Sequence, residues 1–247
     1  MSGRHGGRGA FVSGGTSGMG LATARRFVDE GAKVFIVGTR EEKLRAALAG
    51  LPEGQADGCL CDVADEAEVE AAFERALAFL GRLDAAFVNA GVDGQDRFCL
   101  DLDVDFFRRV IDVNCTGSFL VARAAARRMP DGGGIVFNAS ISGLAAEPGF
   151  ADYSASKGGQ VLLARTFAKE LGPRGFWVTV VCPGYVRTPM VDRYLDDAEV
   201  GPDIVRHIPI GRVGNAEEVA SLVSYLASPE AAYMNGSVVT IDGGRLA

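Results

Sequence analysis

Tyr153 and Lys157 are the two residues whose types and spacing most directly suggest proton chemistry. They stand four positions apart in a stretch whose pattern predicts a helix over residues 151–171, so both side chains lie on one face of that helix. A tyrosine phenol has an ordinary pKa near 10, and proton transfer at neutral pH requires its anion to be favoured by about two units, or roughly 3 kcal/mol. A neighbouring ammonium group can supply such a shift. The pair therefore predicts a tyrosine that acts as a general acid or base.

A serine at the end of a predicted strand is the natural partner for this pair. Ser140 follows the predicted strand 134–138 and stands thirteen residues before Tyr153. Ser142 is a second candidate for the same role. A Tyr-x-x-x-Lys pair alone is usually an exposed pair on a helix, so its interpretation depends on the motifs elsewhere in the chain.

A glycine-rich loop follows the first predicted strand. Residues 13–20 read Ser-Gly-Gly-Thr-Ser-Gly-Met-Gly, in which Gly14, Gly18 and Gly20 have G-x-x-x-G-x-G spacing. Glycines permit a tight turn and let backbone N–H groups and a helix N-terminus approach a pyrophosphate. The alternative is a simple packing turn, because the strict G-x-G-x-x-G spacing is absent. The strand before the loop and the helix after it favour dinucleotide binding.

The elements that position these residues alternate between short apolar strands and longer helices. Several strands lack polar alternation, as expected for parallel strands covered on both faces. The pattern predicts a single-domain, Rossmann-type α/β fold over residues 1–247, with a doubly wound parallel sheet of about seven strands flanked by helices and ligands bound at the carboxyl ends of the strands. The segment 190–209 fits the alternation poorly, and we expect it to cover the substrate. The predicted strands span residues 9–13, 33–37, 58–61, 85–89, 134–138, 177–182 and 237–242. The predicted helices include residues 21–30, 66–80, 105–128, 151–171 and 216–227.

Composition excludes several classes of partner. The chain of 247 residues has 33 glycines and a net charge of −7, which argues against nucleic acid as a partner because phosphate binding needs a concentrated basic face. No signal peptide or long apolar span is visible, so we expect a cytoplasmic protein without a membrane partner.

His5 and His207 belong to no ligand cluster, so no metal is expected and both are interpreted as surface residues. Gly3, Gly6 and Gly7 are interpreted as a loose tail.

Taken in order along the chain, the motifs resemble those of the short-chain dehydrogenase/reductase family. The loop resembles the family's T-G-x-x-x-G-x-G, with Ser13 in place of threonine. Asn89-Ala-Gly91 is similar to the Asn-Asn-Ala-Gly motif, although Val88 replaces its first asparagine. Asn114 and the spacing of Ser140, Tyr153 and Lys157 also match.

The resemblance implies a role for each of the four catalytic residues. Tyr153 would be the general acid/base, and Ser140 would orient the substrate oxygen. Lys157 would lower the pKa of the tyrosine and hold the nicotinamide ribose, while Asn114 would complete a proton relay through water.

The resemblance also implies a cofactor site. Whether NADP or NAD binds is decided after the second strand, where an NAD enzyme commonly carries a carboxylate. The chain reads Val37-Gly-Thr-Arg40 there. Arg40 and Thr39 could bind a 2′-phosphate, so we favour NADP(H), with NAD(H) as the alternative because Glu41 and Glu42 follow closely. The expected cofactor residues are Gly14, Thr16, Ser17, Gly18, Met19, Gly20, Thr39, Arg40, Asp62, Val63, Asn89, Ala90, Gly91, Tyr153, Lys157, Pro183, Gly184, Val186 and Thr188.

These expectations combine into an oxidoreductase that transfers hydride between a nicotinamide and a carbonyl or secondary alcohol. The layout is similar to that of β-ketoacyl carrier protein reductases, and the resemblance implies a homotetramer or dimer. Two alternatives stay open: an inactive cofactor-binding scaffold or regulator, and a lyase or epimerase on the same fold. We expect a partly hydrophobic substrate between residues 92–96, 141–150 and 185–207. The expected apolar wall residues are Phe98, Leu144, Phe150, Tyr185, Met190 and Tyr194.

Overall fold

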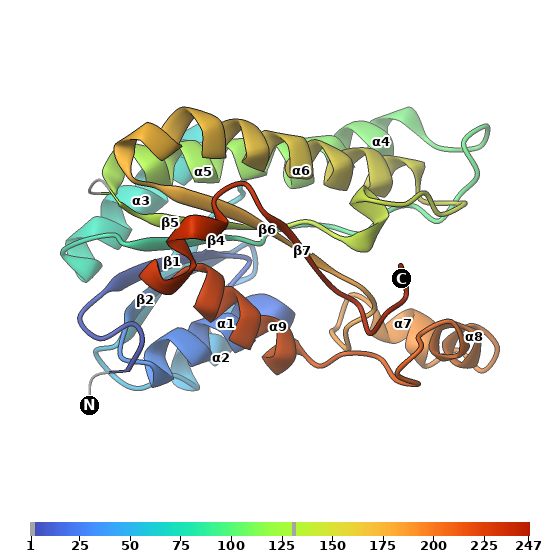
Figure 1. Ribbon diagram of the computed structural model, residues 1–247, viewed down its shortest axis with the longest axis horizontal. Coiled ribbons are helices and arrows are strands. Elements are labelled where there is room, and N and C mark those ends of the chain that lie inside the picture. The colour runs from blue at the N-terminus through green and yellow to red at the C-terminus, as the bar shows by residue number, and fades with distance from the viewer. Residues whose placement is uncertain (1–2, 130–131) are drawn as a thin grey trace.

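The computed structural model describes residues 3–129 and 132–247 and is built around one parallel sheet of seven strands (Figure 1). The strand order is β3-β2-β1-β4-β5-β6-β7, so the order reverses direction at β1. The predicted doubly wound α/β fold is thereby confirmed. The strands are β1 (Gly9–Ser13), β2 (Lys33–Gly38), β3 (Ala56–Leu60), β4 (Ala85–Val88), β5 (Gly134–Asn138), β6 (Trp177–Pro183) and β7 (Val238–Ile241).

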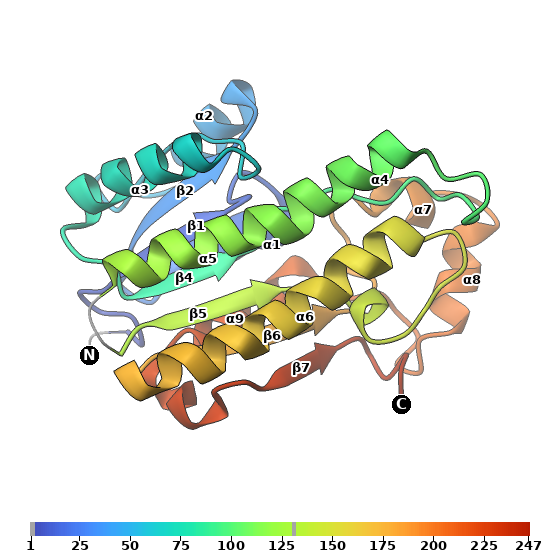
Figure 2. The same ribbon diagram turned by 90° about the horizontal axis from the view of Figure 1, so that it is seen from above.

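Helices cover both faces of the sheet, and the bodies of the central strands are buried. In Figure 1, α3, α5 and α6 lie above the sheet, while α1, α2 and α9 lie below it. Figure 2 shows α3, α5 and α6 side by side across the upper face. Successive residues of a strand point to opposite faces. Phe11 accordingly packs in the upper core and Val12 in the lower core.

The helices agree with the predicted periodic segments except where one is interrupted. The expected helix 105–128 is divided by a π-helical turn (Asp112–Thr116) that contains Asn114. Gly117 follows, and a Cβ there would lie 2.7 Å from Val63 Cγ2, so glycine permits the close approach of these elements. The helices are α1 (Gly18–Asp29), α2 (Glu41–Ala49), α3 (Glu66–Leu80), α4 (Val104–Ile111), α5 (Gly117–Arg128), α6 (Ala151–Leu171), α7 (Asp192–Leu195), α8 (Val200–Arg206) and α9 (Ala216–Leu226). The 3₁₀ turns are Ile141–Gly143, Gly172–Arg174 and Pro229–Met234.

Among the helices of residues 3–129 and 132–247, none is long and apolar enough to cross a membrane.

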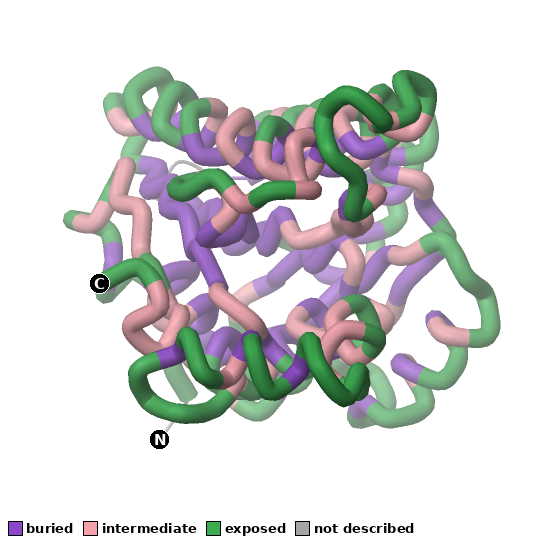
Figure 3. Tube along the Cα trace, turned by 90° about the vertical axis from the view of Figure 1, so that its right-hand side faces the viewer, coloured by how far each residue is buried: buried purple, intermediate pink, exposed green. Residues whose placement is uncertain are grey.

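The segment 190–209 folds into α7 and α8 beyond the carboxyl ends of the strands (Figure 1, right). Both helices are short, which explains why the sequence pattern gives no periodic signal for them. Figure 3 looks onto this end of the molecule, where exposed and half-buried backbone surrounds a buried centre.

The N-terminal segment corrects two expectations. His5 is fully buried rather than on the surface. Its Nε2 lies 3.0 Å from the Ser224 carbonyl oxygen, and its ring packs edge-on against Phe27. The glycines around it do not form a loose tail, since Gly7 N–H donates to the Gly31 carbonyl at 3.2 Å. Burial lowers the pKa of His5, which keeps the ring neutral within the core.

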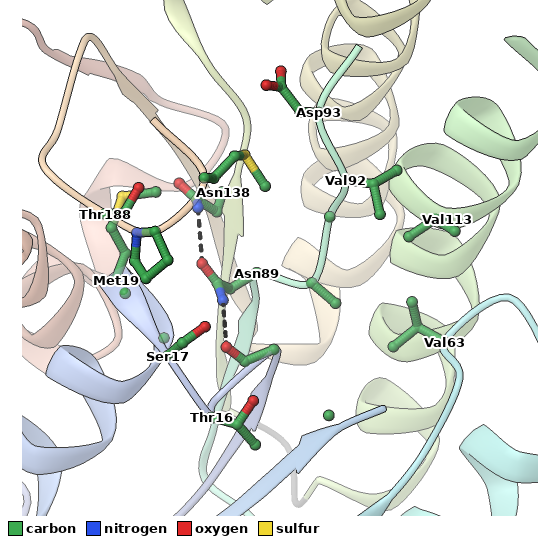
Figure 4. A pocket seen from close by; sticks show the side chains of 18 of the residues that line it. Thr16, Ser17, Met19, Val63, Asn89, Val92, Asp93, Val113, Asn138 and Thr188 are labelled. Carbon is green, nitrogen blue, oxygen red and sulfur yellow. Dashed lines mark hydrogen bonds between the residues drawn. The ribbon is translucent and has the colours of Figure 1, made fainter. Parts of the chain in front are cut away.

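Side-chain hydrogen bonds join the ends of the three central strands. Asn89, which follows β4, donates its Nδ2 to the carbonyls of Ser13 and Gly14 at 2.9 and 3.1 Å. Asn138, the last residue of β5, donates to Asn89 Oδ1 at 2.8 Å (Figure 4). Gly20 packs against the same group, because a Cβ there would lie 2.1 Å from the Gly14 carbonyl oxygen and 2.6 Å from Asn89 Nδ2.

We expect Gly20→Ala to destabilise the protein because the added methyl group displaces the Gly14 carbonyl. Overpacking of this kind costs about 1–3 kcal/mol, equivalent to a fall of roughly 2–10 °C in the melting temperature. Calorimetry checks this. The control is Gly158→Ala in α6, where a Cβ meets only the Gly143 carbonyl at an ordinary 3.7 Å. Equal melting temperatures for wild type and Gly20→Ala would contradict the assigned packing.

Candidate active site

A cavity of about 620 Å³ runs along the carboxyl ends of the strands. Every cofactor residue expected from the sequence lines it. Of the four expected catalytic residues, Ser140, Tyr153 and Lys157 also line it, whereas Asn114 is buried behind the wall. The sequence missed several lining residues, which are Gly38, Lys43, Cys61, Arg109, Val113, Asn138 and Ala139. Five more lie in the segments expected to surround the substrate, which are Val92, Asp93, Pro189, Met190 and Val191.

The glycine loop forms an open anion site at the N-terminus of α1. Ser17 caps this helix without a side-chain hydrogen bond, and the first turn carries no acidic residue. Gly14 and Gly18 have φ angles of 63° and 51°, a region that favours glycine. A Cβ at Gly18 would lie 3.2 Å from Thr188 Cγ2, so the loop packs closely against the segment after β6. The cradle fits a pyrophosphate, since helix-terminal N–H groups bind anions.

The end of β2 carries cationic side chains and excludes a carboxylate. Arg40 and Lys43 both line the cavity. A Cβ at Gly38 would lie 2.8 Å from Thr16 Oγ1, so the close contact favours glycine over aspartate at this position. Glu41 pairs with Arg45 at 2.7 Å and is absent from the cavity lining. Lys43 could have been found from the sequence, because it follows Arg40 by three residues at the start of a helix.

Lys157 is anchored by the strand ends. Its Nζ donates to the Asn138 carbonyl at 2.9 Å and lies 5.5 Å from the centroid of the Tyr153 ring. Only 3% of the residue is exposed. Burial lowers the pKa of Lys157 to about 8, because the ammonium loses hydration.

The phenol of Tyr153 is held in its protonated form by its surroundings. Burial raises the pKa of Tyr153, and the charge of Asp93 raises it further. A hydrogen bond with the Ser140 side chain lowers this pKa, while Tyr194 raises it. Desolvation is thus the largest influence on this phenol, and the expected lowering of its pKa by Lys157 stays a prediction.

The geometry distinguishes the two candidate serines. Ser140 lines the first cavity and interacts with Tyr153. Ser142 is not part of that lining, and its backbone N–H donates to Ser140 Oγ at 3.1 Å. Ser140 is thus the serine that faces the tyrosine, and Ser142 helps to orient it.

Asn114 is fully buried and saturated by hydrogen bonds within the chain. Its Oδ1 accepts from Val92 N–H at 2.7 Å, and its Nδ2 donates to the Val92 carbonyl and to Ser156 Oγ, both at 3.0 Å. A Cβ at Gly91 would lie 3.1 Å from Asn114 Oδ1 and 3.6 Å from Lys157 Nζ. The side chain therefore fixes the loop that separates it from the cavity.

A second cavity of about 410 Å³ adjoins the first. The two share Asp93, Ser140, Tyr153, Gly184, Met190 and Val191. Phe150, Tyr185, Met190 and Tyr194 line the second cavity as expected. Phe98 and Leu144 do not, and they are 70% and 44% exposed. Arg245, which no sequence motif singles out, reaches this cavity from the C-terminal segment and donates to Glu147 at 3.2 Å.

Comparisons with known proteins agree with this arrangement. A family model described as Enoyl-(Acyl carrier protein) reductase matches residues 14–245. The chain is 36% identical over 244 residues to "Short-chain reductase protein NovJ" of Streptomyces niveus, covering 96% of this chain and 93% of the relative. It is 37% identical over 239 residues to the 3-oxoacyl-[acyl-carrier-protein] reductase MabA of Mycobacterium tuberculosis, covering 96% and 92%.

A solved structure of a reductase is also similar to this chain over nearly its whole length. The crystal structure of levodione reductase superimposes with a TM-score of 0.94 at 34% identity, covering 97% of this chain and 98% of that one. The matched regions cover more than nine-tenths of this chain and of each of these reductases. The chain belongs to the short-chain dehydrogenase/reductase family, whose related members are named as reductases and dehydrogenases.

Proposed function

We propose that the protein is an NADP(H)-dependent oxidoreductase that interconverts a carbonyl group and a secondary alcohol, with Tyr153 as the general acid/base. The observation that carries the proposal is that Tyr153 and Ser140 line both cavities and stand at their junction. The cofactor, when bound, supplies the chemistry of hydride donation and acceptance. The first cavity would hold this cofactor and the second the substrate.

The residues of the first cavity divide by the cofactor group that each would hold. The N-terminus of α1 and its three loop glycines suit the pyrophosphate. Asp62 and Val63 would contact the adenine, and Lys157 would hold the nicotinamide ribose. The residues that would surround the nicotinamide end are Asn89, Ala90, Gly91, Pro183, Gly184, Val186 and Thr188.

Tyr153 is suited to donate a proton in the reductive direction. Its raised pKa keeps the phenol protonated at neutral pH, so the proton is available for the developing alkoxide. Ser140 would hydrogen-bond the substrate oxygen beside the phenol. Lys157, whose ammonium is fixed by the Asn138 carbonyl, would stabilise the phenolate that remains after proton donation.

NADP(H) rather than NAD(H) is the proposed cofactor because of charge at the end of β2. Arg40 and Lys43 line the cavity, and within the described residues neither has an ion-pair partner. Thr39 adds a hydroxyl donor. A carboxylate at position 38, which would select the ribose 2′-OH of NAD, would crowd Thr16.

The proposed substrate is a small, partly hydrophobic carbonyl compound or alcohol. Phe150, Tyr185, Met190 and Tyr194 offer apolar surface beside the reacting groups. The segment 190–209 would cover the substrate, since α7 and α8 both contribute to the wall of the second cavity.

We also propose that residues 1–247 form one catalytic domain and that the enzyme is cytoplasmic.

Replacing Tyr153 with Phe should lower kcat about 10²- to 10⁴-fold on any responsive carbonyl substrate, because the proton donor is lost while the ring is kept. Initial rates of NADPH oxidation measure the effect, and a fluorescence titration should show unchanged NADPH binding. The matched control is Tyr233→Phe, which alters a fully exposed tyrosine. Full turnover in Tyr153→Phe would contradict the assignment, and product formed with no net cofactor oxidation would indicate a lyase or epimerase.

Arg40→Ala should raise the Kd for NADPH roughly 10- to 100-fold and leave the Kd for NADH nearly unchanged. The estimate follows from losing a charge-assisted hydrogen bond of about 1.5–3 kcal/mol. Fluorescence titration with both cofactors checks it. The control is Arg45→Ala, because Arg45 is a nearby cation in α2 that is paired with Glu41. A similar loss of affinity for both cofactors would contradict recognition of the 2′-phosphate.

We also propose a homotetramer, with a dimer as the alternative. The helices α5 and α6 lie side by side in the outer layer (Figure 2). Each carries a large exposed apolar side chain, Phe119 on α5 and Leu162 on α6, which a second chain would cover. Leu162→Glu should reduce the mass measured by light scattering after gel filtration, since a charge within an apolar interface is unfavourable. A monomeric wild type would contradict the proposal.

A further inference from the structure

Asp93 occupies the junction of the two cavities. It follows the Asn89–Gly91 motif in the loop after β4 and lines both cavities. Figure 4 shows its carboxylate at the opposite end of the view from Thr16. Its side chain is 20% exposed, so the charge is only partly screened by solvent.

Two side chains of α7 bind this carboxylate. Arg193 Nη2 donates to Asp93 Oδ2 at 2.7 Å, and the Tyr194 hydroxyl donates to the same oxygen at 3.0 Å. Tyr194 also packs its ring 6.3 Å from that of Phe150, which stands before α6. Asp93 thus joins the loop after β4 to a helix that comes from a distant part of the chain and forms the wall of the second cavity.

The same carboxylate acts on the phenol of Tyr153. The groups that face this phenol are Lys157 from its own helix, Ser140 from the end of β5, Tyr194 from α7 and Asp93. Asp93 is the anion among them, and its charge opposes ionisation of Tyr153. The charge of Asp93 also raises the pKa of Tyr194 on α7, whose hydroxyl donates a hydrogen bond to it. A negative charge beside a buried phenol makes the phenolate less favourable.

We propose that Asp93 is a positioning residue for the proposed reaction: its carboxylate fixes α7 against the loop after β4 and places a negative charge beside Tyr153 where the two cavities meet. The inference rests on the proposed function, because it concerns the proton of Tyr153. Asp93 acts through Tyr153 and α7 and transfers no proton of its own. Its two effects are separable, since an amide retains the hydrogen-bond acceptor but lacks the charge.

Asp93→Asn should move the low-pH limb of kcat/KM for alcohol oxidation towards lower pH by roughly one unit. Oxidation requires the phenolate, and removing a neighbouring negative charge makes this form accessible at lower pH. The control is Asp101→Asn, which removes one charge from an exposed residue outside both cavities. Coincident profiles for wild type and Asp93→Asn, or an equal shift in Asp101→Asn, would overturn the effect on Tyr153.

Hydrogen exchange of the cofactor-free protein tests the structural part without reference to activity. In Asp93→Ala, which loses both hydrogen bonds, the backbone amide hydrogens of a peptide covering α7 should exchange about tenfold faster than in wild type. Asp93→Asn should stay close to wild type, since its amide oxygen still accepts from Arg193 or Tyr194. Equal exchange in wild type and Asp93→Ala would overturn the claim that this carboxylate fixes α7.

The outcomes separate this inference from the function on which it rests. If Tyr153→Phe retains full turnover, the proposed function fails, and the pH profile no longer reports on Tyr153. If Tyr153→Phe loses turnover and the Asp93→Asn profile coincides with that of wild type, the function stands and the action of Asp93 on Tyr153 is overturned.

Discussion

A continuous line of hydrogen bonds connects the glycine loop to Lys157, and the rest of the site depends on it. The Gly14 carbonyl accepts from Asn89, Asn89 accepts from Asn138, and the Asn138 carbonyl accepts from Lys157 Nζ. The line crosses the ends of β1, β4 and β5 at the point where the order of strands reverses. Each buried polar group in it would be costly without its partner. The two ends of the proposed cofactor site are therefore held in fixed relation by the sheet itself.

Burial shifts the pKa values of Tyr153 and Lys157 in opposite directions. Desolvation disfavours the charged form of each group, so it raises the pKa of Tyr153 and lowers that of Lys157 to about 8. At pH 7 the phenol is therefore neutral, whereas the lysine is still mostly an ammonium, held by the Asn138 carbonyl in a pocket where an unpaired charge is expensive. The site is thus poised to stabilise a change of charge when a ligand brings one, which is the arrangement that electrostatic catalysis requires.

Sequence reasoning succeeded where the local pattern and the topology determine position. The strand ends and the long helices carry Gly14, Asn89, Ser140 and Tyr153, so knowing the parallel order was enough to bring them to one edge of the sheet. The π-helical turn at Asn114 was not predictable, because the helical pattern continues through it and only packing against neighbouring elements interrupts it. His5 was misjudged for a related reason: its burial comes from contact with Phe27 and Ser224, which are distant in the sequence.

The second cavity was less predictable because it is assembled from short segments that have no periodicity. The helices α7 and α8 have four and seven residues, and Arg245 reaches the second cavity only because the chain continues past β7. Contacts such as those of Asp93 with Arg193 and Tyr194 join residues about a hundred positions apart. Side chains in such segments can change without disturbing the sheet or the line of hydrogen bonds through Asn89. The fold therefore constrains the proposed cofactor side strongly and the proposed substrate side weakly, which is consistent with similar relatives bearing the names of reductases and dehydrogenases for different substrates.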